Sequence, residues 1–137
     1  MTATTTPRNT PERLGDVIGA PAKGSALLLA GTIAVANAGY AAPATTATGL
    51  VALGRVEETV DNTAGADGAA VVKVRRGIFK FANQAGDLVT QANAFADCYL
   101  VDNQTVAATS AGNTRSRAGK VIAVEPDGVF VAIGLGY

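Results

Sequence analysis

The stretch KVIAVEPDGVFVAI, residues 120–133, is the part of the sequence that decides the fold class. Two runs rich in valine and isoleucine, residues 120–125 and 129–133, flank Pro126-Asp127-Gly128. Proline presets φ at such a reversal, and Asp-Gly favours a left-handed turn residue. Because β-branched side chains also favour strands, the stretch predicts a β-hairpin.

The same pattern of short apolar runs separated by turn residues extends through the preceding sequence. No segment keeps a helical stripe for three turns, and the best helix candidate is a short one at residues 92–96. We therefore predict an all-β fold, a small β-barrel or β-sandwich. The further expected elements are a second hairpin over residues 98–109 that turns at Asn103-Gln104, strands at 26–29, 32–36 and 50–60, and a loop at 38–48.

The apolar residues of one predicted strand change phase between Val74 and Phe79. Val72 and Val74 share one face of a period-2 pattern, whereas Phe79 and Phe81 fall on the other face. A β-bulge at Arg76-Gly77 would restore a single register, because glycine tolerates the backbone that a bulge needs. The alternative is that the segment forms two separate short strands.

The N-terminal residues show no hydrophobic period, are rich in threonine and contain two prolines. We predict an extended arm over residues 1–22, followed by a β-rich domain over residues 23–137. An isolated arm of this kind should be disordered, so we expect another chain to order it. The expected protein-interface residues are Thr4, Thr5, Thr6, Pro7, Arg8, Pro11 and Arg13 in the arm, with Arg75 and Arg76 in the domain. The alternative for the two domain arginines is that they are ordinary solvated charges.

The composition argues against catalysis and against nucleic-acid binding. The chain has no histidine and one cysteine, so neither imidazole chemistry nor a Cys-His nucleophile is available. Eleven basic residues balance eleven acidic ones, which leaves no basic excess to neutralise phosphates. We therefore predict a protein that is not an enzyme, with no catalytic, cofactor-binding or metal-binding residues and no nucleic-acid partner.

Three features that could suggest chemistry or targeting have simpler explanations. Cys98 lies in an apolar run with no neighbouring base to lower its pKa, so a buried structural thiol is expected. Asp61 and Asp67 lie in a stretch that lacks EF-hand spacing and is typical of tight turns. The apolar residues between 26 and 36 fall short of the roughly 20 that span a bilayer, so we expect no membrane segment and no membrane partner.

Four stretches within residues 50–133 resemble proteins of one known family. They are LGRVEETVDNTAGADG at residues 53–68, VKVRRGIFKFAN at 72–83, CYLVDNQTV at 98–106 and SRAGKV at 116–121. They resemble small structural proteins encoded in the head-morphogenesis region of tailed bacteriophages and prophages. The family is that of the capsid decoration proteins, also called cement or minor capsid proteins. Residues 1–49 lie outside the resemblance.

The resemblance implies a β-rich protein that lacks catalytic residues and binds the major capsid protein, commonly as a homotrimer at local threefold positions. We therefore expect a virion structural protein that stabilises the outer capsid surface. It would be made in the cytoplasm of the bacterial host and reside on the capsid exterior. The alternatives are another virion role, as a head-tail connector or fibre base, or a carbohydrate-binding β-module. The last lacks the tryptophans on which sugar rings commonly stack.

Overall fold

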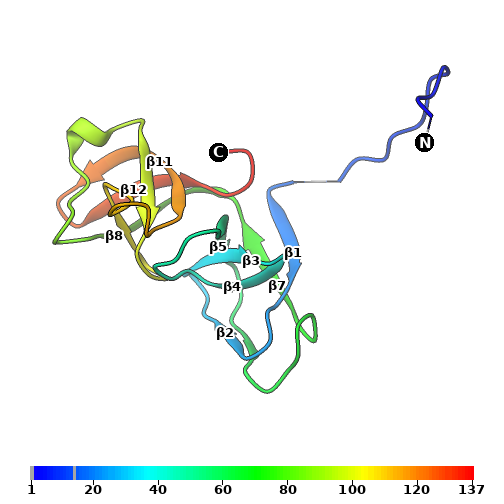
Figure 1. The fold of residues 1–137 in the computed structure, drawn as a ribbon, viewed down its shortest axis with the longest axis horizontal. Helices are drawn as coiled ribbons and strands as arrows, with labels where there is room; N and C mark the ends of the chain where they lie inside the picture. Colours follow the sequence, from blue (N-terminus) through cyan, green and yellow to red (C-terminus); the bar gives the residue numbers. More distant parts are fainter. Residues whose placement is uncertain (1, 14) are drawn as a thin grey trace.

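A computed structural model describes residues 2–13 and 15–137 of the chain, and the described residues form an all-β fold, as predicted (Figure 1). The strands of the N-terminal half are β1 (Val17–Pro21), β2 (Ala26–Leu28), β3 (Ile33–Asn37), β4 (Tyr40–Pro43), β5 (Val51–Val56), β6 (Val60–Asn62) and β7 (Val71–Arg75). Those of the C-terminal half are β8 (Gly77–Asn83), β9 (Asp97–Leu100), β10 (Thr105–Ala107), β11 (Arg117–Glu125) and β12 (Gly128–Ile133). A 3-10 helix, η1 (Gln91–Asn93), overlaps the start of the short helix predicted at residues 92–96.

The first half of the chain builds a five-stranded antiparallel sheet in the order β1-β7-β5-β3-β4, which we call the N-terminal sheet. A parallel bridge joins Ala22, just after β1, to Ala41 in β4, so the two end strands approach each other. β2 pairs with β6 in a separate two-stranded sheet, not with β3. β3 instead forms a hairpin with β4, and β4 lies inside the segment of residues 38–48 that was predicted as a loop. Its turn residues Ala38 and Gly39 both have positive φ, which suits the twist of a two-residue hairpin turn.

The second half of the chain closes into a barrel in the order β10-β8-β12-β11-β9, which we call the barrel. Both predicted hairpins are confirmed, since β11 pairs with β12 and β9 pairs with β10. At the tip of the β11–β12 hairpin neither Asp127 nor Gly128 has positive φ, so the expected left-handed turn residue was wrong. Gly128 instead allows a close approach of β8, because a Cβ there would lie 2.8 Å from the Phe81 carbonyl oxygen.

The phase change in the middle of the chain marks a change of sheet. β7 ends at Arg75 in the N-terminal sheet, and β8 begins at Gly77 in the barrel. Val74 is buried in the core of the sheet, and Phe81 is buried in the core of the barrel. The bulge prediction was therefore wrong, and the alternative of two separate strands is correct. Each strand keeps its own alternation because each buries one face against a different core.

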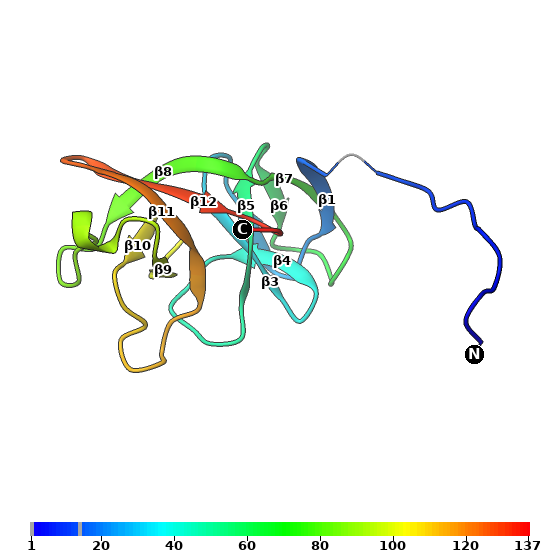
Figure 2. The same cartoon turned by 90° about the horizontal axis from the view of Figure 1, so that it is seen from above.

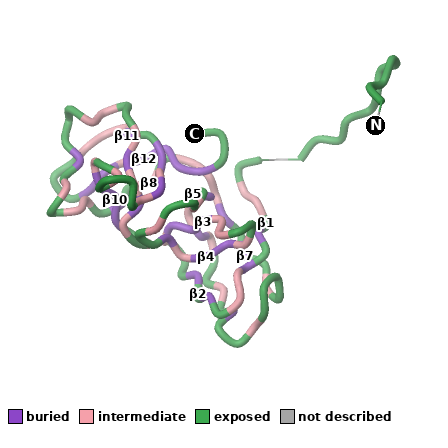
Figure 3. Tube along the Cα trace, viewed as in Figure 1, coloured by how far each residue is buried: buried purple, intermediate pink, exposed green. Residues whose placement is uncertain are grey.

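Two hydrophobic cores lie side by side and share β3 (Figure 3). Ile33 and Val35 of β3 pack with the barrel residues, while Ala34, between them, packs with the other core. The barrel core also holds Phe81, Leu100, Val106, Val121, Val129, Val131 and Ile133. The core of the N-terminal sheet holds Ala20, Ala22, Ala26, Leu28, Ala34, Ala41, Leu53, Val56, Val72 and Val74. Because successive strand residues point to opposite faces, one strand can join both cores.

The described residues before β1 extend away from the body of the molecule (Figures 1 and 2). All of residues 2–13 are exposed. The predicted arm of residues 1–22 is longer than the segment that extends outward, because Val17–Pro21 pairs with β7 as β1. Within residues 2–13 and 15–137, no helix is long and apolar enough to cross a membrane.

Candidate functional site

The predicted interface residues of the arm all lie in its exposed part. Thr4, Thr5, Thr6, Pro7, Arg8, Pro11 and Arg13 are exposed and have no regular secondary structure. Among the described residues, the arm's hydrogen bonds are local ones between Thr4 and Thr6, such as the Thr4 hydroxyl donating to the Thr6 carbonyl oxygen at 3.0 Å. The arm therefore offers its other backbone groups to solvent or to a partner.

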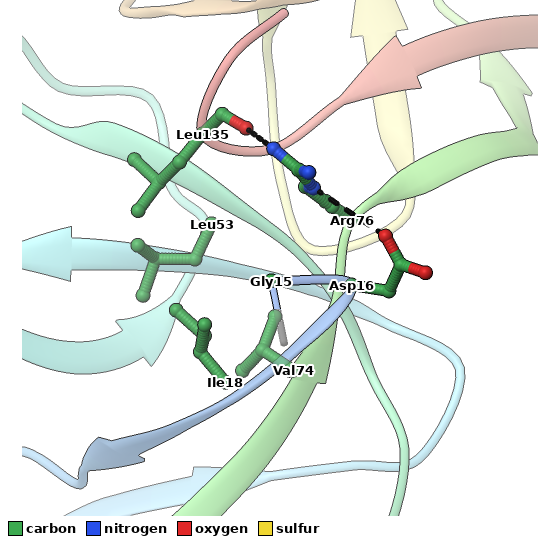
Figure 4. Close-up of a pocket in the computed structure, with 7 residues that line it drawn as sticks. All are labelled: Gly15, Asp16, Ile18, Leu53, Val74, Arg76 and Leu135. Atoms are coloured by element: carbon green, nitrogen blue, oxygen red, sulfur yellow. Dashed lines mark hydrogen bonds and ion pairs between the residues drawn. The ribbon is translucent and has the colours of Figure 1, made fainter. Parts of the chain in front are cut away.

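An apolar pocket of about 210 Å³ opens where the arm enters the sheet (Figure 4). Its apolar wall comes from four separate parts of the chain: Ile18 of β1, Leu53 of β5, Val74 of β7, and Leu135 after β12. Leu135 is exposed, so this wall of the pocket lies at the molecular surface. A pocket with these walls can accept an apolar side chain but offers little for binding a polar ligand.

Arg76 joins the arm to the C-terminal segment across this pocket. Its Nη1 donates to the carbonyl oxygen of Leu135 at 2.9 Å, and its Nε lies 3.8 Å from Oδ1 of Asp16 (Figure 4). The Arg76 backbone N–H also donates to the Asp16 carbonyl oxygen at 2.9 Å. The residue that connects the two sheets thus also positions the start of β1.

Arg75 belongs to a different cluster. Its Nε lies 3.3 Å from Oε2 of Glu57, whose Oε1 accepts a hydrogen bond from Nη2 of Arg55 at 2.7 Å. The bond from Arg55, with a further contribution from Arg75, lowers the pKa of Glu57. The Arg55 guanidinium also lies 4.3 Å from the centre of the Phe79 ring, a cation–π contact between the two sheets. Arg75 and Arg76 therefore have ionic partners within this chain, and their contact with another protein stays a prediction.

The segment after β12 folds back against both sheets. Nη1 of Arg117 donates to the carbonyl oxygen of Tyr137 at 2.8 Å, as Arg76 does to Leu135. Gly134 has a φ of +117°, and a Cβ there would lie 3.0 Å from the Leu53 carbonyl oxygen. Only a glycine fits this turn without strain, so the chain can pass between the barrel and the N-terminal sheet.

The groups that could support chemistry are held in structural roles. Cys98 is fully buried in the barrel, as expected, and burial raises its pKa to about 12, which leaves it a protonated thiol at neutral pH. Asp61 accepts hydrogen bonds from the backbone and hydroxyl of Thr63, two residues on, as turn residues do. Asp67 accepts one from the backbone of the distant Gly24, so it ties two parts of the chain together. In the part of the chain that the structure describes, no three His, Cys, Asp or Glu residues gather as a metal site would require.

The sequence placed the arm but not the pocket at its root. Ile18, Leu53 and Leu135 come from separate segments, and none carries a motif. The available signal was the phase change beside Arg76, which marks where the chain leaves one sheet for the other. Comparisons of this chain with protein-family models, with curated proteins and with solved structures found no match.

Proposed function

We propose that this chain is a structural protein of a tailed-phage virion, a decoration protein that binds and stabilises the outer capsid surface as a homotrimer. The observation that carries the proposal is the exposed arm of residues 2–13 on a β-rich body. The four decoration-like sequence stretches, all of which lie within the body, support it. Its partners would be the major capsid protein and copies of itself.

The arm is suited to bridging subunits of an assembly. If its twelve residues were fully extended at about 3.3 Å each, the arm would reach about 40 Å, far enough to cross a neighbouring protein surface. Threonine and proline keep the arm extended and leave it without a core of its own. Such an arm gains its order from backbone hydrogen bonds to a partner, a common mode of peptide recognition.

Mass action would make such binding stabilising. A protein that binds only the assembled, expanded shell favours that shell over its dissociated subunits by an amount that grows with its concentration. The task needs buried contact area rather than a reacting group. Arg76 and Arg117 hydrogen bond to the C-terminal segment, and the thiol of Cys98 is buried. These side chains stabilise the fold, which fits a protein that acts through contact area.

The test measures binding to expanded, empty capsids of the phage or prophage that encodes the chain. Full-length protein should raise the temperature at which the capsids come apart. At the same concentration, a variant that lacks residues 2–13 should occupy the capsids at least about tenfold less than the full-length protein. Circular dichroism of the variant serves as the control, because its melting temperature should stay close to that of the full-length protein.

Two results would contradict the proposal. Equal capsid occupancy with and without the arm would show that the arm is not part of the binding surface. If full-length protein neither binds nor stabilises the capsids, the protein is not a decoration protein. An assembly of six or twelve copies in ring symmetry would point instead to a head-tail connector.

A further inference from the structure

The outer edge of β1 carries unpaired backbone groups. In an antiparallel pair, alternate residues bond to the partner strand and the residues between them point away from it. The Arg76 N–H donates to the Asp16 carbonyl oxygen at 2.9 Å, and the Ala22 N–H donates to the Ala70 carbonyl oxygen at 2.8 Å. With the register of β1 against β7, the even-numbered residues of β1 therefore bond to β7. The N–H and C=O groups of Val17 and Gly19 therefore point away from β7, and among the described strands β1 pairs with β7 alone.

The barrel and the far end of the N-terminal sheet are better protected. The barrel is closed and so has no end strand. At the far end of the N-terminal sheet, the Ala41 carbonyl oxygen of β4 accepts a hydrogen bond from the Lys23 N–H at 2.8 Å. Pro43 at the end of β4 has no N–H to donate. Of the two ends of the N-terminal sheet, the start of β1 is therefore the one where a further strand can add.

The arm contains a segment that matches this edge in length and chemistry. Pro21 has no N–H, so the available ladder is short and spans Val17 to Ala20. In the arm, residues 2–6 have the sequence TATTT and contain no proline before Pro7. Threonine is β-branched and favours an extended strand. These residues are exposed and hydrogen bond only locally within the described part of the chain.

We propose that residues 2–6 of a second copy add as a strand to the outer edge of β1. Each copy then carries one donor segment and one acceptor edge, so the contact is heterologous and closes into a ring when the rotation between copies allows. The added strand would also cover Ile18, which lines the apolar pocket at the arm root. The inference rests on the self-association in the proposed function. Its test needs no capsid, so its failure would leave capsid binding open.

The decisive experiment mixes two complementary variants of the purified protein and measures their mass. A variant without residues 2–13 keeps the acceptor edge but lacks the donor segment. Val17→Pro keeps the donor segment, and it removes an outward N–H from the acceptor edge while leaving the hydrogen bonds to β7 in place. Each variant alone should be a monomer where the wild-type protein is an oligomer, and the mixture should form a one-to-one complex.

A pair of arm variants tests the same contact without altering the body. Thr4→Pro removes a backbone donor within the segment, whereas Thr4→Val keeps the donor and the strand preference. The oligomer should dissociate at about tenfold higher concentration with proline than with valine. This pair decides the question even if Val17→Pro fails to fold.

Amide hydrogen exchange locates the contact. In the wild-type oligomer, the Val17 and Gly19 amides should exchange about tenfold more slowly than in the variant without the arm. An oligomer that survives removal of the arm overturns the proposal, and so does a mixture that forms no complex. Protection of Val17 and Gly19 in a monomer also overturns it, because the edge would then belong to the chain's own arm.

Discussion

The barrel and the N-terminal sheet use the same kind of strand for different purposes. The barrel closes on itself, and its core contains three alanines among fourteen buried residues. The N-terminal sheet stays open at β1, and five of its ten buried core residues are alanines. Closure satisfies every strand edge, whereas an open edge leaves backbone groups for a partner. From this difference we propose that the barrel supplies most of the stability and the open sheet offers the interaction surface.

The largest expected effect comes from truncating a core side chain in each region. Ile133→Ala in the barrel should lower the free energy of unfolding by about 2 to 5 kcal/mol, because Ile133 is fully buried among large side chains. Val74→Ala in the alanine-rich core should cost about 1.5 to 3 kcal/mol, since less side chain is lost. Urea unfolding of both variants measures the difference. A larger loss for Val74→Ala would reverse the assignment of stability to the barrel.

The next effect tests the joint between the two regions. Gly134→Val should cost about 1 to 3 kcal/mol, because Gly134 has a φ of +117° and a Cβ would meet Arg76 and the Leu53 carbonyl oxygen. The matched control is Gly86→Ala, where a Cβ meets nothing within 4 Å, and it should stay within about 0.5 kcal/mol of wild type. Thermal melting measures both variants. Equal melting temperatures would mean that the packing of the C-terminal segment between the barrel and the N-terminal sheet does not stabilise the fold.

A smaller effect comes from an ion cluster on the barrel. Asp97 lies 2.8 Å from both Lys120 and Arg117, which together lower its pKa below the ordinary 3.8. A lowered folded-state pKa contributes stability above the unfolded value and loses it as the pH falls through the folded value. Asp97→Asn should therefore cost up to about 1 kcal/mol at neutral pH, and the cost should shrink as the pH falls below the ordinary Asp pKa of 3.8.

The control for this pH dependence is Glu58→Gln. Glu58 is exposed and has no ionic partner within the described residues. Unfolding free energies from denaturant titrations at several pH values should show little difference between this variant and wild type. A cost of Asp97→Asn that persists unchanged in acid would show that the side chain acts through packing or neutral hydrogen bonds instead of through its charge.

The smallest effect on stability belongs to the arm. Deletion of residues 2–13 should change the melting temperature by about 1 °C or less, because these residues are exposed and bury no core. Calorimetry at low protein concentration, where copies do not associate, measures the change. A large drop in the monomer would mean that the arm packs on its own body, and the contrast between a stabilising barrel and an interacting N-terminal region would weaken.

The parts of the fold that depend on neighbouring residues were predictable, and the parts that depend on distant contacts were not. The β11–β12 and β9–β10 hairpins were predicted because a local turn brings two adjacent strands together. The Ala38-Gly39 turn was missed because Ala38 gives no turn signal, although it adopts a positive φ. The pairing of β2 with β6 was also missed, since strands far apart in the sequence carry no mark of their partner.

The candidate site divides in the same way. Threonine, proline and the missing hydrophobic period indicated an exposed arm from the sequence alone, because these properties are local. Arg76 contacts both Asp16 and Leu135 only because Leu135, 59 positions later in the sequence, folds back to it.

The sequence by itself determined the all-β class, the extended character of the arm and the places where the β9–β10 and β11–β12 hairpins turn. These follow from side-chain shape and backbone preference within a few residues. The tertiary structure alone decided which strands close into the barrel, which edge of β1 stays open and where the apolar pocket lies. Those features depend on which distant surfaces bury each other, and that choice belongs to the packing of the whole chain.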